Sequence, residues 1–319
     1  MDVAKETHEA EKRIRPFIRA TPLEYSPHLS RSGKCQVHLK LENFQHSGSF
    51  KARGALSKYL SLDDSDKEKG IITASSGNHA SAVAYVLHKF AERGTIYIPH
   101  STPQAKVDLL RLYGVALEFK GQYSVETEVY AQEIARKQEQ VYISPYNDLK
   151  VIGGQGTIGI ELLHEIDTID SILVPIGGGG LIAGIGGYVK SVHKGIEIIG
   201  CETESSPAMS ASIKAGQIIH VGYHPTLADG TAGGFEQGSI TFKLCQDTVD
   251  DYILVSEDEM ARAIRFILDK HSILLEGSAA MPVAAFLKQR DRFKNKNVVL
   301  ILTSSKIDLE TLKKILWRK

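Results

Sequence analysis

The stretch SILVPIGGGGLIAGIGGYV, residues 171–189, begins with a short apolar run and passes through four consecutive glycines into a second apolar segment. Its length and lack of charge are those of a membrane span, but it contains seven glycines and Pro175. A buried strand, a glycine loop and a buried helix account for this composition better. The stretch therefore predicts one strand–loop–helix unit of an α/β fold.

On both sides of this stretch, short apolar runs alternate with longer segments of helical period, as in βαβ units with a mostly parallel sheet. The polar, glycine-rich segment 146–156 separates two groups of strands and is expected to connect two lobes. The expected strands cover residues 37–42, 70–75, 95–99, 115–120, 171–176, 196–202, 251–256 and 297–303. The expected helices begin near Lys51, Asn78, Thr102, Ser124, Gly154, Gly180, Pro207, Glu257, Glu276 and Asp308.

The composition excludes several classes of protein. Of 319 residues, 42% are hydrophobic and 24% charged, so a substantial core can form. Lys plus Arg and Asp plus Glu both number 38, and without a block of like charge nucleic-acid binding is excluded as the main function. The N-terminus lacks an apolar signal segment, so we expect a cytoplasmic protein with no membrane partner. The distant Cys35, Cys201 and Cys245 predict neither a disulfide framework nor a cysteine metal site.

The four glycines Gly177, Gly178, Gly179 and Gly180 follow an expected strand and open an expected helix. Their backbone N–H groups can therefore point at an anion at the N-terminus of that helix. We interpret the loop as a phosphate-binding site, because a tight turn seldom needs four glycines in succession. The alternative is a turn packed closely on a neighbouring element.

The same loop also fits a dinucleotide-binding fingerprint. Gly178, Gly180 and Ala183 match G-x-G-x-x-G/A, and Glu202 ends the next expected strand, where an acid would bind a ribose. An NAD-dependent dehydrogenase is therefore an alternative. A second match within residues 154–159 has no acid in a comparable place and is expected to belong to the lobe junction.

Loop 43–50, NFQHSGSF, leads into Lys51 at the expected start of a helix. A lysine at the mouth of a cleft, preceded by small residues, suits a Schiff base with an aldehyde cofactor, which hydride transfer does not need. The positive end of a helix dipole lowers the pKa of an ammonium group, and this favours a nucleophilic amine. The alternative is an ordinary solvated lysine.

Loop 75–79, SSGNH, joins an expected strand to an expected helix. Ser76 and Asn78 lie where side chains and exposed N–H groups can bind a carboxylate and a ring oxygen. The alternative for both residues is simple capping of the helix. The residues alone assign no role to His79.

Taken together, these segments resemble the pyridoxal-phosphate-dependent enzymes of fold type II, and within them the threonine/serine dehydratases and serine racemases. The resemblance implies an α/β, tryptophan synthase β-like fold of two lobes, each a mostly parallel twisted sheet flanked by helices. Residues 1–52 and 148–319 would form the larger cofactor-binding lobe, and residues 53–147 the smaller mobile lobe. The matching motifs are TPL (21–23), LKLENFQHSGSFKARGA (39–55), SSGNHA (75–80), GGQGTIG (153–159), PIGGGGLIAG (175–184), LADGTAGG (227–234), EGSAA (276–280) and LTSSKID (302–308).

The resemblance also implies the cofactor, pyridoxal 5'-phosphate, and the residues that hold it. Lys51 would form the Schiff base, Gly177 to Gly180 would bind the phosphate, and Phe50 would pack on the ring. Asn78 would bond the ring hydroxyl oxygen, and Thr303 falls where the family places a hydroxyl or thiol beside the pyridine nitrogen. The residues that would receive the substrate carboxylate are Ser75, Ser76, Gly77, Asn78 and His79.

A hydroxyl partner cannot keep the pyridine protonated as an aspartate can, so elimination is the expected chemistry. Lys51 would remove the α-proton, while the cofactor phosphate or a nearby acid would assist the departing β-hydroxyl. The expected enzyme is therefore a lyase: a dehydratase (ammonia-lyase) that converts a β-hydroxy amino acid such as L-threonine or L-serine to a 2-oxo acid and ammonia.

Three further alternatives remain beside the NAD-dependent dehydrogenase. A serine racemase is one, because racemases use a serine at the position of Ser76 as a second acid/base. A dehydratase of an unusual hydroxy amino acid, such as a hydroxyectoine derivative, is another, since residues 228–242 resemble that type. The third is a non-catalytic regulator that retains the cofactor fold. Family members usually form dimers or tetramers, so a homo-oligomer is expected.

Two places depart from the family pattern. Many dehydratases have S-G-G-N after the last strand, whereas residues 303–306 are T-S-S-K, and Lys306 is expected to be a solvated surface charge. The racemase-type metal site would fall on Glu202, Ser206 and Ala208. Because alanine supplies no oxygen ligand, we expect no firm Mg²⁺ site.

Overall fold

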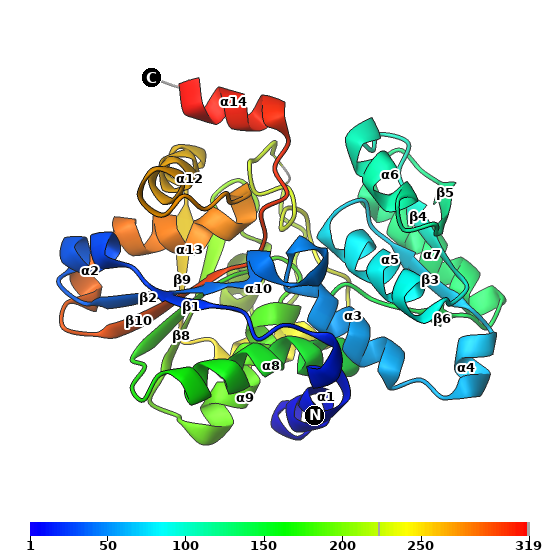
Figure 1. Ribbon diagram of the computed structural model, residues 1–319, viewed down its shortest axis with the longest axis horizontal. Helices are drawn as coiled ribbons and strands as arrows, with labels where there is room; N and C mark the ends of the chain where they lie inside the picture. The colour runs from blue at the N-terminus through cyan, green and yellow to red at the C-terminus, as the bar shows by residue number, and fades with distance from the viewer. Residues whose placement is uncertain (223, 318–319) are drawn as a thin grey trace.

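The structure is a computed structural model that describes residues 1–222 and 224–317. The fold contains two separate sheets, one of six strands and one of four (Figure 1). The larger sheet combines the N-terminal and C-terminal parts of the chain, and the smaller sheet is built from the cyan and green segment between them. The expected α/β class with mostly parallel sheets is confirmed.

The larger sheet has the strand order β1-β2-β10-β7-β8-β9, and only the edge strand β1 is antiparallel to its neighbour. The register pairs Val298 with Val37, and Leu300 with Leu39 and Leu173. Because side chains alternate along a strand, the central strands contribute to two cores, one on each face. The strands are β1 (Leu23–Tyr25), β2 (Gln36–Leu41), β7 (Ser171–Pro175), β8 (Glu197–Thr203), β9 (Asp251–Val255) and β10 (Asn297–Leu302).

Helices cover both faces of this sheet, with α12, α13 and α2 on one face and α1, α8 and α9 on the other (Figure 1). The helices of this part are α1 (Val3–Ile14), α2 (Pro27–Gly33), α8 (Leu149–Glu165), α9 (Gly180–Val192), α10 (Ala208–Ala215), α11 (Ile240–Thr248), α12 (Glu257–His271), α13 (Gly277–Lys288) and α14 (Leu309–Trp317). Short 3-10 turns occur at Arg15–Phe17, Glu42–Phe44, His46–Gly48 and Arg290–Phe293.

The smaller sheet is parallel throughout, in the order β5-β4-β3-β6. Helices α5 and α6 pack on one face through residues such as Ala84 and Val107, and α7 packs on the other through Ala131 and Ala135. The elements are α3 (Lys51–Leu60), α4 (Asp64–Glu68), β3 (Ile71–Ala74), α5 (Asn78–Phe90), β4 (Gly94–Ile98), α6 (Gln104–Arg111), β5 (Ala116–Phe119), α7 (Ser124–Lys137) and β6 (Val141–Tyr142).

Helix α8 begins earlier than the expected start near Gly154. The helix begins at Leu149, after Asp148 caps it by accepting from the N–H groups of Lys150 and Val151. The glycines there permit close packing instead of breaking the helix. A Cβ on Gly154 would lie 2.6 Å from the carbonyl oxygen of Arg53, and a Cβ on Gly156 would lie 2.9 Å from that of Gly184. The weak second glycine fingerprint at 154–159 is thus an interhelical contact.

The eight expected strands are all present, with ends that shift by at most one residue. The stretch 171–189 divides as expected into a strand, a glycine loop and a helix. Strands β1 and β6 were not expected, because they have three and two residues and lack an apolar run. Within the described part of the chain, no helix is both long and apolar enough for a membrane crossing.

Candidate active site

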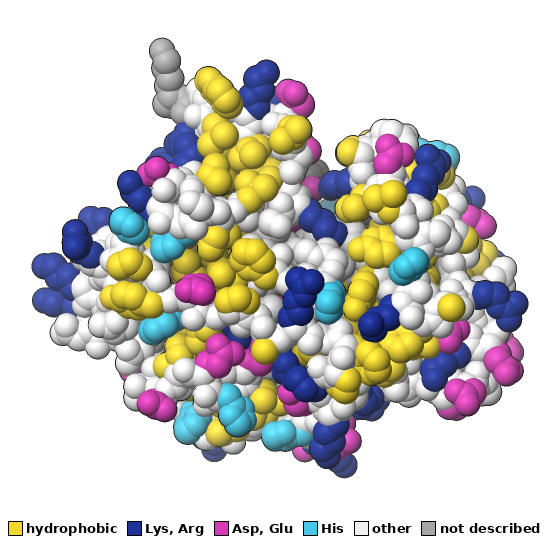
Figure 2. Space-filling model, in the orientation of Figure 1, with side chains coloured by type: hydrophobic (Ala, Val, Ile, Leu, Met, Phe, Trp, Pro, Cys, Tyr) yellow, Lys and Arg dark blue, Asp and Glu magenta, His cyan; other side chains and the backbone are white. Residues whose placement is uncertain are grey.

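A cavity of about 510 Å³ lies between the two sheets. Its walls are the loops after β3, β7 and β10 and the start of α3, because parallel strands bring their carboxyl ends to one edge. Figure 2 shows a hollow on the surface between the part of the molecule that contains the larger sheet and the part that contains the smaller one. Every site residue expected from the sequence lines the cavity: Phe50, Lys51, Ser75, Ser76, Gly77, Asn78, His79, Gly177, Gly178, Gly179, Gly180 and Thr303.

Lys51 is the first residue of α3, and its side chain points into the cavity. Its Nζ donates a hydrogen bond to the carbonyl oxygen of Pro145 at 2.7 Å and lies 5.1 Å from the centre of the Phe50 ring. Burial lowers the pKa of Lys51 to about 8, although the carboxylate of Glu128 opposes this shift. A sizeable fraction of the amine is therefore unprotonated in mildly alkaline solution, as a nucleophile requires.

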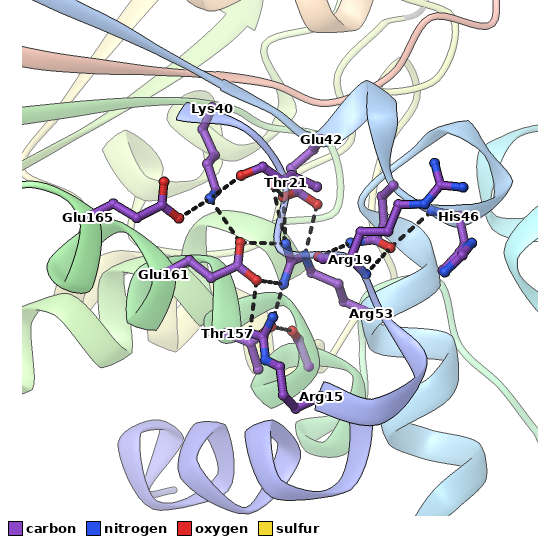
Figure 3. Close-up of polar contacts among 12 residues, drawn as sticks. Arg15, Arg19, Thr21, Lys40, Glu42, His46, Arg53, Thr157, Glu161 and Glu165 are labelled. Atoms are coloured by element: carbon purple, nitrogen blue, oxygen red, sulfur yellow. Dashed lines mark hydrogen bonds and ion pairs between the residues drawn. The ribbon is translucent and has the colours of Figure 1, made fainter. Parts of the chain in front are cut away.

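A buried ion network holds the helix that carries Lys51 (Figure 3). The guanidinium of Arg53, two residues after Lys51, donates to Glu42 at 2.7 and 2.8 Å and to Glu161 at 2.8 and 2.9 Å. Lys40 contacts Glu161 at 2.8 Å. The network joins α3 to the end of β2 and to α8, so it fixes the position of the lysine relative to the larger sheet.

The glycine loop after β7 presents its backbone to the cavity. The N–H groups of Gly177, Gly178, Gly179 and Gly180 donate to no acceptor among the described residues. Gly179 has φ +85°, a left-handed conformation that favours glycine. A Cβ on Gly178 would lie 2.4 Å from the ring of Tyr146, and one on Gly180 would lie 2.9 Å from its Cα. Both reasons for the glycines therefore hold: close packing on one side and free donors on the other.

The loop after β3 leads into α5 without a side-chain cap. Gly77 occupies the N-cap position and Asn78 begins the helix, so the capping alternative for Ser76 and Asn78 is wrong. The amide of Asn78 donates to Glu276 Oε1 at 2.9 Å and to Ser304 Oγ at 3.2 Å. Its Oδ1 is buried and has no partner among the described residues. Asn78 thus keeps a free acceptor at the cavity wall.

His79 is buried and held by its Nε2, 2.9 Å from the carbonyl oxygen of Ile143. Burial and the charge of Lys51 lower the pKa of His79 to about 3. The imidazole is therefore neutral near pH 7 and cannot supply a proton as an imidazolium. Its place in the wall makes its backbone, together with the rest of loop 75–79, available to a carboxylate.

The loop after β10 carries Thr303, which is 3% exposed and whose carbonyl oxygen accepts from the N–H of Phe50 at 3.2 Å. Lys306, three residues on, also lines the cavity. Its Nζ is buried and has no hydrogen-bond partner among the described residues, and burial lowers its pKa to about 8. The expectation of a solvated surface charge is therefore wrong, because the loop folds the side chain inward beside Gly48.

Glu202 has a local structural partner. Its Oε1 and Oε2 accept from the backbone N–H groups of Met209 and Ser210, each at 2.9 Å, at the start of α10. It thus caps a helix instead of facing the glycine loop as a ribose-binding acid would. In the described part of the chain, no three or more His, Cys, Asp or Glu side chains gather as a metal site would require. The expected lack of a firm Mg²⁺ site stays a prediction.

With this geometry established, comparison with known proteins identifies the family. The family model described as "Pyridoxal-phosphate dependent enzyme" matches residues 14–304, most of the chain. The chain belongs to this family. A catabolic L-threonine dehydratase of Staphylococcus aureus is 41% identical over 305 residues, which cover 94% of this chain and 88% of the relative.

Two further similar proteins are named for two different activities, an ammonia-lyase and a racemase. An L-threonine ammonia-lyase of Thermotoga maritima is 36% identical over 316 residues, covering 99% of this chain and 78% of the relative. The structure of maize serine racemase superposes with a TM-score of 0.92 at 32% identity, covering 99% of this chain and 97% of that one. The fold type II architecture is thereby confirmed.

The residues of the cavity fit pyridoxal phosphate. A buried amine is present for an aldehyde at Lys51, four free N–H groups at a helix N-terminus suit a phosphate, and Asn78 Oδ1 is an orphan acceptor that suits a ring hydroxyl. The family membership removes the NAD-dependent dehydrogenase alternative, and the capping role of Glu202 explains why its fingerprint was misleading.

Several cavity residues were missed by sequence reasoning: Lys106, Glu128, Tyr146, Asp229 and Glu276. Glu276 belongs to the EGSAA motif that contributed to the resemblance, so a signal for it existed. Burial raises the pKa of Glu276 to about 7, although hydrogen bonds from Ser304 and Asn78 oppose the shift. Glu128 had no signal, since a single acid in a helix with many charges is usually solvated.

Proposed function

We propose that the protein is a pyridoxal-phosphate-dependent ammonia-lyase that converts a β-hydroxy amino acid, such as L-threonine or L-serine, to a 2-oxo acid and ammonia. The observation that carries the proposal is the meeting of Lys51, the loop 75–79, the glycine loop and Thr303 around one cavity. The names of the relatives from S. aureus and T. maritima support the same reaction.

The residues around the cavity have different roles in this reaction. When bound, the cofactor withdraws electrons from the α-carbon of the amino acid and so acidifies its proton. Lys51 supplies the amine that holds the cofactor and then takes the α-proton. The N–H groups of loop 75–79, at the positive end of α5, orient the substrate carboxylate. The free N–H groups of Gly177 to Gly180 hold the phosphate, and Phe50 packs on the ring.

Thr303 favours elimination over reactions that need a long-lived carbanion. A hydroxyl is a far weaker acid than a carboxylic acid, so Thr303, as the partner of the ring nitrogen that the resemblance implies, would not keep a proton there. The α-carbon then carries more of the negative charge, and loss of a β-substituent competes well. The catalytic and binding roles of the individual residues stay predictions, and replacement of Lys51 tests the central one.

The experiment is a panel of β-hydroxy amino acids with detection of the 2-oxo acid, applied to the purified enzyme and to Lys51→Ala. We expect the wild type to absorb in the near-violet and to deaminate at least one substrate, and the variant to lose both properties. Borohydride reduction and peptide mapping should locate the cofactor on Lys51. Lys69→Ala is the control, because that lysine is exposed and pairs with Asp66 on the surface. A fully active Lys51→Ala would refute the assignment.

Serine racemase is a second candidate, favoured by Ser76. This residue lines the cavity at the position where racemases have an acid/base, and maize serine racemase shares the fold closely. Chiral analysis of L-serine incubated with the wild type and with Ser76→Ala tests it. Formation of D-serine by the wild type but not by the variant would establish racemisation, whereas no inversion by the wild type removes this candidate.

The proposal extends to the setting of the enzyme. We infer a small-molecule amino acid substrate, a cytoplasmic location and a homo-oligomer, with residues 53–147 as a smaller mobile lobe against 1–52 and 148–319. The exposed Leu309, Leu316 and Trp317 on α14 support self-association. The substrate panel includes hydroxyectoine-derived amino acids, because residues 228–242 resemble dehydratases of that type.

A further inference from the structure

Glu128 is an acidic residue of the cavity that has no role in the proposed reaction as described so far. It lies in the second turn of α7 and lines the cavity on the side of Lys51. It lies one residue after Thr127 and three before Ala131, which are 1% and 0% exposed, so it is next to the buried face of the helix. Its Oε1 is buried and has no hydrogen-bond partner among the described residues.

The surroundings of Glu128 favour its neutral, proton-donating form. Burial and the charge of Glu236 raise the pKa of its carboxyl to about 7, and Lys51 acts in the opposite direction. The groups that face it are Lys51 from α3, Tyr142 from β6, Tyr146 beyond that strand and Glu236 from the segment before α11. Near neutral pH, a large fraction of Glu128 is therefore a carboxylic acid with a proton to give.

The proposed reaction needs such a donor, because hydroxide is a poor leaving group and departs readily only as water. Three other acid or imidazole groups of the cavity already have hydrogen-bond or ion-pair partners. His79 is neutral and bonded to a backbone carbonyl. Glu276 accepts from the Asn78 amide, and its charge reaches Lys306. Asp229 is ion-paired with Lys106 at 3.1 Å. Glu128 is the carboxylate whose charge reaches Lys51.

We propose that Glu128 is the general acid that protonates the departing β-hydroxyl group, an inference that rests on the proposed function. The Cβ–O bond breaks and its electron pair stays on oxygen, which takes the proton of Glu128 and leaves as water. Lys51 takes the α-proton, and the electron pair of the Cα–H bond becomes the Cα=Cβ double bond. The proton on Lys51 or one from solvent then restores Glu128, so the cycle is redox-neutral and balanced.

A change of leaving group tests this role, because chloride departs without a proton. Initial rates are measured with L-serine and with β-chloro-L-alanine for the wild type and for Glu128→Gln. Since general acids contribute about 10²–10⁴-fold, we expect kcat/KM for L-serine to fall at least ~100-fold. Elimination of chloride should change by less than about threefold, because it does not use the acid.

Glu133→Gln is the matched control, since Glu133 lies on the same helix, is exposed and pairs with Lys137. It should leave both substrates unaffected. Equal losses for the two substrates in Glu128→Gln, or no loss for either, would overturn the proposal for Glu128 while leaving the lyase function intact. A wild type that deaminates no hydroxy amino acid would instead overturn the proposed function itself.

The wild type alone provides a second test that does not depend on the folding of a variant. The ratio of kcat/KM for L-serine to that for β-chloro-L-alanine should fall about tenfold per pH unit once pH exceeds the pKa of Glu128, since only the acid form donates. The ionisation of Lys51 affects both substrates and cancels in the ratio. Glu236→Gln removes a like charge, so it should move this fall to lower pH. A flat ratio from about pH 6 to about pH 9 would overturn the proposal.

Discussion

Replacing Arg53 by methionine should destabilise the enzyme strongly, because Arg53 is fully buried between two carboxylates. Losing the guanidinium affects its two partners, Glu42 and Glu161, unequally. Glu161 keeps Lys40 and Arg15, each at 2.8 Å. Glu42 is 0% exposed and would keep the hydroxyl of Thr21 at 2.5 Å. The variant therefore leaves the buried carboxylate of Glu42 without a positively charged partner.

Breaking a buried ion pair by removing one partner costs about 3–5 kcal/mol, and we expect Arg53→Met to lie in that range. A whole protein of ordinary stability has about 5–15 kcal/mol, so the variant would be marginal. Adding Glu42→Gln removes the stranded charge, and the double variant should recover about half of the loss or more. The order of stability is then wild type, double variant, Arg53→Met.

The assay is urea unfolding of the apoenzymes, followed by circular dichroism, with Arg111→Met as control. Arg111 is 61% exposed and lies 3.6 Å from the equally exposed Asp108, so the control should change stability by less than about 0.5 kcal/mol. A loss below about 1 kcal/mol for Arg53→Met, or a double variant no more stable than the single one, would show that the network does not stabilise the fold by charge pairing.

Three other residues give predictions of their own. Burial opposes the charge of Glu161, but Arg53 and Lys40 lower its pKa from 4.5 to about 2. The ionised Glu161 therefore stabilises the folded state above pH 4.5, and this stabilisation is lost as pH falls toward 2. Acid unfolding of Glu161→Gln should lack that part of the pH dependence. Gly178→Ala should weaken cofactor binding at least ~10-fold in absorbance titrations, because the new Cβ meets Tyr146 at 2.4 Å, whereas Gly195→Ala, in open space, should not. Lys306→Met should stabilise the apoenzyme below about pH 8, by about 1–3 kcal/mol in urea unfolding, since it removes a buried ammonium for which the described residues supply no acceptor; an unchanged or lower midpoint would contradict this.

The sequence predicted the parts of the structure that depend on local pattern. Runs such as residues 297–303 are apolar enough to specify central strands, and the glycine loop after residues 171–176 is unusual enough to specify a ligand site. Because the strands are parallel, their carboxyl ends meet, and the expected site residues therefore surround one cavity.

The parts that sequence reasoning missed depend on neighbours far along the chain. The start of α8 was hidden because its glycines indicate a loop until the facing helices are known. Lys306 and Glu128 are polar residues in polar segments, and their burial is decided by other elements that fold against them. Strand β6 has two residues, too few for any periodicity.

The ion pair between Lys106 on α6 and Asp229 spans the mouth of the cavity, from the smaller sheet to the larger part of the molecule. Its side chains are 37% and 58% exposed, so the pair contributes at most about 1 kcal/mol and weakens as ionic strength rises. Opening the entrance thus costs little free energy at physiological salt. Substrate entry and product release are expected to accelerate with added salt, while the ion network around Arg53, shielded from solvent, keeps Lys51 in place.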